Sequence, residues 1–263
     1  MSFKKISVIG AGVMGEALIT ALIEAGHQPE NIQIIEKRKE RCDELVAKHA
    51  IKVGNQLSDC DVLLLVTKPQ DVEAALAEIK GELSKTALVI SFAAGKKIAT
   101  ISAGLGGENP VVRVMPNTPT LVGKGAAGYS LGNGVDEHQK KFVIDFLTAA
   151  GVAVEVTEDL QDAVTATSGS GPAYFFAFVE AMVKGAIDLG LSETVATELT
   201  VQTIVGAAKL LETSGKSAQT LRENVTSPNG TTFAALQSFA ANDLEKIVAI
   251  AMKAARDRSI ELS

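Results

Sequence analysis

The sequence predicts an α/β domain with a doubly wound, mostly parallel sheet, followed by an all-helical domain. Short β-branched and apolar runs alternate with helical patterns as far as residue 157, and only long helical patterns follow. Unbroken apolar strands separated by helices are typical of a parallel sheet that helices cover on both faces. We therefore expect two domains, residues 1–157 and residues 158–263.

Strand and helix alternate through most of the first domain. The expected strands are mainly apolar stretches, rich in β-branched residues, at 6–9, 32–35, 62–67, 87–92 and 111–115. The expected helices between them lie at 13–25, 39–49 and 72–79. Gly26 ends the first helix, and Pro69 marks the loop after the third strand.

The remainder of this domain is richer in glycine and proline. A Pro-Asn-Thr-Pro turn at 116–119 stops the fifth strand. Beyond it we expect a strand at 128–131, a helix at 137–150 and a last edge strand at 152–156.

The second domain is expected to contain helices alone. They lie at 172–189, 192–213, 218–225, 231–241 and 243–262. Pro172 is tolerated in a first helical turn, Gly190 ends that helix, and Ser192 is a typical N-cap for the next.

The helix at 172–189 is apolar on all sides, which a surface helix is not. A domain of this size covers such a helix only in part, so we expect a homodimer formed through the helical domain. The alternative is a helix that is buried within its own domain.

Composition excludes several classes of protein. The net charge is −6, and no basic cluster is long enough to follow a phosphate backbone, so nucleic acid is not expected as a partner. No apolar run approaches the roughly 18 residues of a membrane helix, and the N-terminal run is too short for a signal peptide. Cys42 and Cys60 lie in charged or polar surroundings without a C-x-x-C spacing and are expected to be reduced, with one disulfide between them as the alternative. We therefore expect a cytoplasmic protein.

A glycine-rich loop follows the first strand directly and opens the first helix. Its residues are Gly10, Ala11, Gly12, Val13, Met14 and Gly15. In a G-x-G-x-x-G loop the first glycine permits a tight turn, the second lets the backbone approach a pyrophosphate, and the third lets helix and strand pack closely. The loop predicts a dinucleotide site at the positive end of the helix.

Residues after the second strand bear on the choice of dinucleotide. Glu36 is suited to accept hydrogen bonds from a ribose 2′-hydroxyl, which favours NAD(H). Lys37, Arg38 and Lys39 are suited to pair with a 2′-phosphate. Three cations against one anion favour NADP(H), with NAD(H) as the alternative.

Four further motifs carry a family resemblance. They are Val66-Thr67-Lys68-Pro69, Met115-Pro116-Asn117-Thr118-Pro119, Gly169-Ser170-Gly171-Pro172-Ala173-Tyr174 and Val225-Thr226-Ser227-Pro228-Asn229-Gly230-Thr231-Thr232. With the glycine loop they make the chain similar, from end to end, to the pyrroline-5-carboxylate reductase family. The departures are Thr67 within a V-K-P motif, Asn229 in place of a glycine, and Glu36 where the family often has a small polar residue. Asn tolerates a positive φ, so the turn at 229 can survive.

The resemblance implies a Rossmann domain followed by a helical dimerisation domain, with dimers that often assemble into decamers. It implies reduction of the small imino acid L-1-pyrroline-5-carboxylate to L-proline by NAD(P)H, the last step of proline biosynthesis. The implied active site lies between the nicotinamide and the helical domain.

The motif that ends at Thr232 precedes a helix, so the N–H groups of Gly230, Thr231 and Thr232 are expected to be unpaired and to bind a carboxylate, beside Ser227. The Thr232 hydroxyl is placed to hydrogen-bond the imine nitrogen, and the resemblance implies the same catalytic role. The alternative is that Thr232 only caps the helix.

The remaining site assignments concern the cofactor and the pocket beside it. Ser170 is expected to shape the nicotinamide end of the substrate pocket. Asn117, held in a stiff turn near a strand end, is expected to contact the cofactor. Asn55 is assigned to the adenosine end by the resemblance. The other expected cofactor contacts are Val66, Thr67, Lys68, Pro69 and Ala94. His27, His49 and His138 are far apart in sequence and lie in polar settings, so each is expected at the surface and no metal is expected.

Two rival functions differ in testable ways. A β-hydroxyacid dehydrogenase requires a lysine where this chain has Phe175 and an asparagine where it has Val179. An alcohol substrate needs a general base, whereas an imine does not. A non-enzymatic nicotinamide-sensing module would keep the glycine loop without a reason to keep the motif that ends at Thr232.

Overall fold

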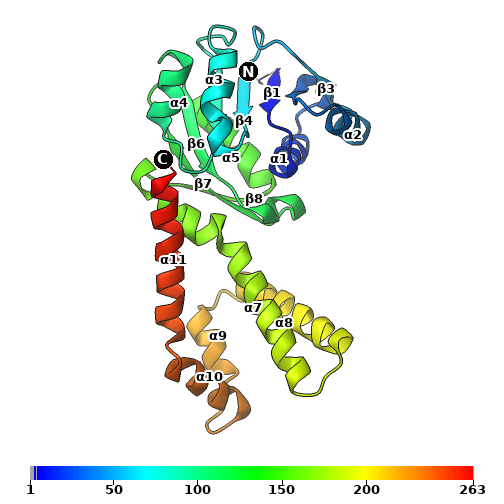
Figure 1. The fold of residues 1–263 in the computed structure, drawn as a ribbon, viewed down its shortest axis with the longest axis vertical. Helices are drawn as coiled ribbons and strands as arrows, with labels where there is room; N and C mark the ends of the chain where they lie inside the picture. The colour runs from blue at the N-terminus through cyan, green and yellow to red at the C-terminus, as the bar shows by residue number, and fades with distance from the viewer. Residues whose placement is uncertain (1–2, 4, 263) are drawn as a thin grey trace. The chain divides into compact units, whose positions relative to one another are not determined.

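The computed structural model describes Phe3 and residues 5–262, which form two compact units. Unit 1 consists of the chain up to Pro172 together with the stretch that begins at Ala254. Unit 2 is Ala173–Lys253. Figure 1 shows that unit 1 contains the sheet and that unit 2 is built from helices.

Unit 1 contains a sheet of eight strands among the described residues. They are β1 (Ile6–Ile9), β2 (Ile32–Ile35), β3 (Lys52–Val53), β4 (Val62–Leu65), β5 (Leu88–Ser91), β6 (Val111–Met115), β7 (Gly125–Leu131) and β8 (Gly151–Glu155). Their order is β3-β2-β1-β4-β5-β6-β7-β8. All neighbours are parallel except β6 and β7, and β8 is an edge strand. This confirms the predicted doubly wound, mostly parallel sheet.

Helices cover both faces of the sheet. They are α1 (Val13–Glu24), α2 (Lys39–His49), α3 (Val72–Ile79), α4 (Ile98–Leu105) and α5 (Glu137–Ala149). One buried cluster joins the sheet to α1, α2 and α5, and a second joins it to α3 and α4. Along β4, Val62 and Leu64 belong to the first cluster, while Leu63 and Leu65 belong to the second. This alternation is why the strand is apolar at every position.

The structure also contains elements that the sequence did not reveal. β3 is two exposed residues long, and α4 was not predicted. β7 begins at Gly125, three residues before the expected start, because the glycine-rich segment pairs with β8 as well as with β6. A short helix α6 (Gln161–Val164) and a π-helical turn (Thr165–Gly169) precede the predicted long helix.

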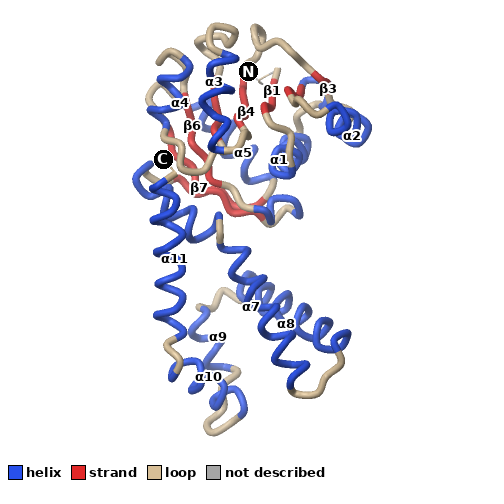
Figure 2. Tube along the Cα trace, in the orientation of Figure 1, coloured by secondary structure: helices blue, strands red, loops and turns tan. Residues whose placement is uncertain are grey.

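The helices beyond α6 agree closely with the prediction. They are α7 (Gly171–Asp188), α8 (Glu193–Thr213), α9 (Ala218–Asn224), α10 (Thr231–Ala241) and α11 (Leu244–Glu261). Ser192 caps α8 as expected, since its side chain accepts a hydrogen bond from the Val195 amide. Figure 2 shows helix and loop, without strand, through unit 2. None of the helices in the described part of the chain is both long enough and apolar enough to span a bilayer.

Unit 2 leaves large apolar side chains open to solvent. Phe175 and Phe176 on α7 are each 63% exposed, and Phe178 is 43% exposed. Several apolar residues of α8 and α11 are exposed as well. A monomer rarely exposes so much apolar surface. The alternative of a helix buried within its own domain is therefore wrong, and the expected cover from a second copy gains support.

Two other details of unit 1 differ from what the sequence suggested. Cys42 and Cys60 are free, but both are buried instead of lying in polar surroundings. The side chain of His49, expected at the surface, is largely covered and lies 3.3 Å from a carboxylate oxygen of Glu16.

Candidate functional site

The glycine loop joins the carboxyl end of β1 to the start of α1. Gly10 has a positive φ of 88°, and a Cβ there would lie 2.8 Å from the Val66 carbonyl oxygen. Gly12 is the N-cap of α1, no side chain caps that end, and a Cβ at Gly12 would meet nothing within 4 Å. A Cβ at Gly15 would overlap the Gly10 carbonyl oxygen. The second glycine therefore faces open space, while the first and third are needed for packing.

The open face of the loop is suited to an anion. The amides of the first helical turn have no partner within the helix, and the aligned peptides give this end a partial positive charge. Because Gly12 carries no side chain, a phosphate can approach these amides closely.

Glu36, immediately after β2, is folded against the loop. Its carboxylate accepts hydrogen bonds from the Ala11 amide at 3.1 Å, the Arg38 amide at 3.1 Å, and the Arg38 guanidinium at 3.0 and 3.1 Å. The hydrogen bond from the Arg38 side chain is the main reason that the pKa of Glu36 falls to about 2. Burial opposes this shift, since only 9% of the side chain is exposed.

The three cations after Glu36 differ in their surroundings. Arg38 is bound to Glu36 along one edge, yet its side chain is 61% exposed. Lys37 forms an exposed ion pair with Glu78 at 3.0 Å, and Lys39 begins α2. Arg38 is therefore the cation that the structure holds in place beside the loop.

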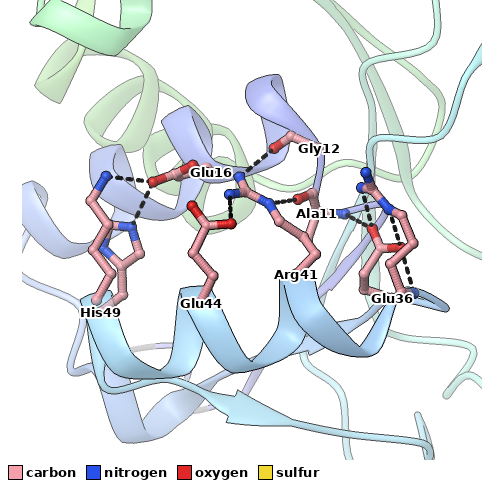
Figure 3. A network of polar contacts seen from close by, with 9 residues as sticks. Ala11, Gly12, Glu16, Glu36, Arg41, Glu44 and His49 are labelled. Carbon is pink, nitrogen blue, oxygen red and sulfur yellow. Dashed lines mark hydrogen bonds and ion pairs between the residues drawn. The ribbon is translucent and has the colours of Figure 1, made fainter.

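A second charged group reaches the loop from α2 (Figure 3). Arg41 donates its Nε–H to the Ala11 carbonyl at 2.9 Å and its Nη2–H to the Gly12 carbonyl at 3.3 Å. The same guanidinium pairs with Glu16 and, at 2.7 Å, with Glu44. Sequence reasoning missed Arg41, because its contacts lie about 30 residues back along the chain. The one available signal was a charged partner, Glu16, directly after the last glycine.

A cavity of about 500 Å³ adjoins the loop. Its lining includes Gly10 and Gly12 from the loop, Glu36, Lys37 and Arg38 from the turn after β2, and Val66, Thr67 and Lys68 from the turn after β4. The structure thus brings together three predicted groups of cofactor residues. The Thr67 hydroxyl is buried and has no hydrogen-bond partner among the described residues.

Other predicted cofactor residues lie elsewhere in unit 1. Asn55 lines a separate cavity of about 370 Å³. Pro69 begins a short 3-10 helix, and Ala94 follows β5, and neither is among the residues that line the 500 Å³ cavity. Their contact with a cofactor stays a prediction.

The buried side chain of Asn117 connects two other backbone segments by hydrogen bonds. Its amide nitrogen donates to the Ser168 carbonyl at 3.0 Å, and its amide oxygen accepts from the Ala126 amide at 2.9 Å. It thus ties the turn after β6 to β7 and to the π-helical turn. Ser170 directly follows that turn, and its amide donates to the Thr165 carbonyl at 2.8 Å. A cofactor contact by Asn117 and a substrate contact by Ser170 stay predictions.

The motif that ends at Thr232 forms the start of α10 in unit 2. Asn229 has a φ of 59°, so it adopts the left-handed conformation that the sequence allowed for. Gly230 is the N-cap, and no side chain caps the helix. The Gly230 amide donates to the Ser227 carbonyl at 3.1 Å, so the expectation that this amide is unpaired is wrong. Thr231 and Thr232 are in the first turn, whose amides lack partners within the helix.

Each part of the chain matches a family model. Residues 158–262 match the model for pyrroline-5-carboxylate reductase dimerisation. Residues 5–95 match the model for NADP oxidoreductase, coenzyme F420-dependent.

Individual relatives resemble the chain over its whole length. A pyrroline-5-carboxylate reductase of Corynebacterium melassecola is 41% identical over 98% of both chains, and one of Pseudomonas aeruginosa is 41% identical over 100% of this chain and 98% of its own. The solved pyrroline-5-carboxylate reductase of Coxiella burnetii has a TM-score of 0.92 and 35% identity, covering 100% of this chain and 99% of its own. The Plasmodium falciparum enzyme, solved with NADP bound, has a TM-score of 0.88 and 31% identity over 99% of both chains. Identity at this level over both complete units shows that the chain belongs to the pyrroline-5-carboxylate reductase family.

Proposed function

We propose that this chain reduces L-1-pyrroline-5-carboxylate to L-proline, with hydride supplied by bound NADPH. The observation that carries the proposal is the 41% identity to a pyrroline-5-carboxylate reductase over 98% of both chains. The glycine loop of unit 1 and the start of α10 in unit 2 supply the residues for cofactor and substrate respectively. The division into a cofactor domain at 1–157 and a substrate and dimerisation domain at 158–263 is part of this proposal.

The residues beside the loop fit a dinucleotide. Gly12 leaves open space at the positive end of α1, where a pyrophosphate would accept hydrogen bonds from the first-turn amides. Thr67 lines the same cavity, and its buried hydroxyl has no hydrogen-bond partner among the described residues, which leaves it available to a bound dinucleotide.

The preference for NADPH over NADH rests on Glu36 and Arg38. A carboxylate at this position would bind a ribose 2′-hydroxyl, but that of Glu36 already accepts four hydrogen bonds. Arg38 is oriented by this pairing and keeps its outer edge exposed, as a 2′-phosphate requires. A relative solved with NADP bound agrees with this preference.

Reduction of an imine by a nicotinamide requires little covalent participation by the protein. It requires a held substrate and a group that orients the C=N bond toward the hydride donor. The first-turn amides of Thr231 and Thr232 are suited to bind the substrate carboxylate, beside Ser227. The Thr232 hydroxyl is then available to donate a hydrogen bond to the ring nitrogen. Reduction would add hydride from the nicotinamide to the ring carbon and a proton, drawn from water, to the nitrogen.

A homodimer completes the proposal. The family model matched by residues 158–262 describes dimerisation, and α7 exposes Phe175 and Phe176 to solvent. A second copy that packs on this surface would bury these aromatic side chains.

The test is oxidation of NADPH, and separately NADH, by the purified protein with L-1-pyrroline-5-carboxylate. We expect turnover with both, with a higher kcat/KM for NADPH. Thr232→Ala is expected to lower kcat/KM by about 100-fold, the typical loss when one side chain positioned to assist proton transfer is removed. Thr213→Ala, at the end of α8, is the matched control and should retain wild-type activity.

Three outcomes would change the proposal. Full activity in Thr232→Ala would remove the catalytic role of that hydroxyl and leave the reaction in place. Dinucleotide binding without turnover of the imino acid would refute the reductase function and favour a sensing module. Reduction of NADP⁺ by a β-hydroxy acid would favour the dehydrogenase.

A further inference from the structure

Arg41 makes contacts that its position on a surface helix does not require. Its side chain is only 14% exposed and ends against the backbone of the glycine loop (Figure 3). Within that loop it binds two successive carbonyl groups, those of Ala11 and Gly12. A guanidinium suits this task, because its donors are held in a rigid planar fork.

Holding these carbonyls fixes the direction of the amides that follow them. In a trans peptide the C=O of one residue and the N–H of the next point in opposite directions. The bond from Arg41 to the Ala11 oxygen therefore turns the Gly12 N–H away from α2. The Gly12 oxygen also accepts the Glu16 amide of α1 at 3.0 Å, and the bond from Arg41 reinforces the same orientation for the Val13 N–H. These are amides at the start of α1, where no side chain caps the helix.

The guanidinium is itself held by two carboxylates. Glu16, in the first turn of α1, pairs with it, and so does Glu44, one helical turn further along α2. Glu16 is also bound by Lys48 at 2.6 Å and contacted by His49 at 3.3 Å. The Lys48 hydrogen bond is the largest cause that brings the pKa of Glu16 down to about 2, so this carboxylate is charged throughout the neutral range. The network links α2, the loop and α1.

We propose that Arg41 is a positioning residue for dinucleotide binding, which presents the Gly12 and Val13 amides to the pyrophosphate by holding the two carbonyls behind them. The inference rests on the proposed function, because it needs a pyrophosphate at the open face of the loop. Arg41 touches neither phosphate nor nicotinamide in this role and acts through the backbone alone. Its loss should therefore weaken binding of the pyrophosphate and leave the adenosine end unaffected.

The test compares two ligands on the full-length protein by calorimetry. NADPH contains the pyrophosphate, whereas adenosine 2′-monophosphate carries only the adenosine end and its 2′-phosphate. Arg41→Gln is expected to raise the Kd of NADPH by about tenfold, since it removes charge-assisted hydrogen bonds that hold the amides. The Kd of adenosine 2′-monophosphate should change by less than about twofold, because this ligand lacks the pyrophosphate that the loop amides bind.

Two further variants separate this role from a purely structural one. Arg41→Lys keeps the charge but loses the fork, so it should bind one carbonyl and give an intermediate Kd for NADPH. Lys141→Gln, the control, removes one side of an exposed ion pair with Asp145 on α5 and should leave both Kd values unchanged. If Arg41→Gln does not fold, Arg41→Lys serves as the test variant. With saturating NADPH, kcat should stay near the wild-type value while KM for NADPH rises.

Equal weakening of both ligands, or no weakening of either, would overturn the proposal. NADPH binding by the wild type without reduction of the imino acid would refute the proposed reaction alone, and the comparison of ligands would still decide the role of Arg41. A wild type that binds no dinucleotide would refute both.

Discussion

The substitution Gly12→Ser separates the stability of the glycine loop from its capacity to bind a cofactor. Gly12 is the N-cap of α1, and its backbone has a φ of −69° and a ψ of −161°, which any residue can adopt. A Cβ at this position meets nothing within 4 Å. Serine is also among the preferred N-cap residues, since its hydroxyl accepts a hydrogen bond from a first-turn amide.

The two effects have different expected sizes. Serine in place of glycine at an N-cap should change the free energy of unfolding by only a few tenths of a kcal/mol, in the stabilising direction. The new side chain occupies the space that the phosphate needs and takes up one of its amides. Loss of one hydrogen bond to a charged group costs about 1.5–3 kcal/mol, which corresponds to roughly 10- to 150-fold weaker NADPH binding.

Gly15→Ala serves as the comparison, because it should lower the stability of the protein. Its Cβ would overlap the Gly10 carbonyl oxygen, and backbone cannot yield as a flexible side chain can. Overpacking of this kind costs about 1–3 kcal/mol of stability.

Denaturant unfolding gives the stability of both variants, and calorimetric titration gives the Kd of NADPH. We expect Gly12→Ser to be as stable as the wild type and to bind NADPH weakly, and Gly15→Ala to be destabilised. Wild-type affinity in Gly12→Ser would show that the phosphates do not approach the loop at Gly12. A large loss of stability in that variant would show that the space beside Gly12 is needed by the fold.

Three other predictions concern charge, bracing and assembly. Because the folded-state pKa of Glu16 is about 2 against an ordinary 4.5, its contribution to stability is complete above pH 4.5 and is lost as the pH falls toward 2. Glu16→Gln should lower the free energy of unfolding at pH 7 by about 1–2 kcal/mol, after allowance for the exposed Lys48 partner. It should also weaken the fall in stability between pH 4.5 and pH 2, and an unchanged fall would contradict the prediction. Asn117→Ala should cost about 1–3 kcal/mol in denaturant unfolding, because it leaves the Ser168 carbonyl and the Ala126 amide without their side-chain partner; a cost within error of zero would show that water replaces it. Phe175→Glu should shift sedimentation toward the monomer, and an undisturbed dimer would place the interface away from this part of α7.

The fold was predictable wherever burial fixed the sequence pattern. Strands β1, β4 and β5 lie inside the sheet and are buried at every position, so their residues are apolar apart from Ser7 and Ser91, and the runs are visible in the sequence. β3 could not be found in this way, since it is two exposed residues held only by pairing with β2. The first half of β7 was not recognised as strand, because it is rich in glycine and its strand conformation depends on pairing with neighbouring strands and not on its own side chains.

The site was predictable to the extent that its chemistry lies in the backbone of one continuous segment. The glycine spacing revealed the loop, and Asn229 was read correctly as a residue able to take a positive φ. Contacts made by side chains over long separations were not visible. Arg41 lies on a helix with other charged residues, and only the packing of α2 beside the loop distinguishes it from them.

Glu36 and Arg38 show how the structure changes the meaning of a sequence. Read along the chain, an anion that favours NADH stands against cations that favour NADPH. In the structure the two side chains are hydrogen-bonded to each other, and the same carboxylate accepts the Ala11 amide. Ala11 is therefore held from both sides, because its N–H donates to the Glu36 carboxylate and its C=O accepts from the Arg41 guanidinium. Under the proposed function, a carboxylate at this position is compatible with NADPH, because it orients Arg38 and holds the Ala11 amide of the loop. It follows that Glu36→Gln, which removes the charge but keeps the shape, should weaken NADPH binding without improving that of NADH.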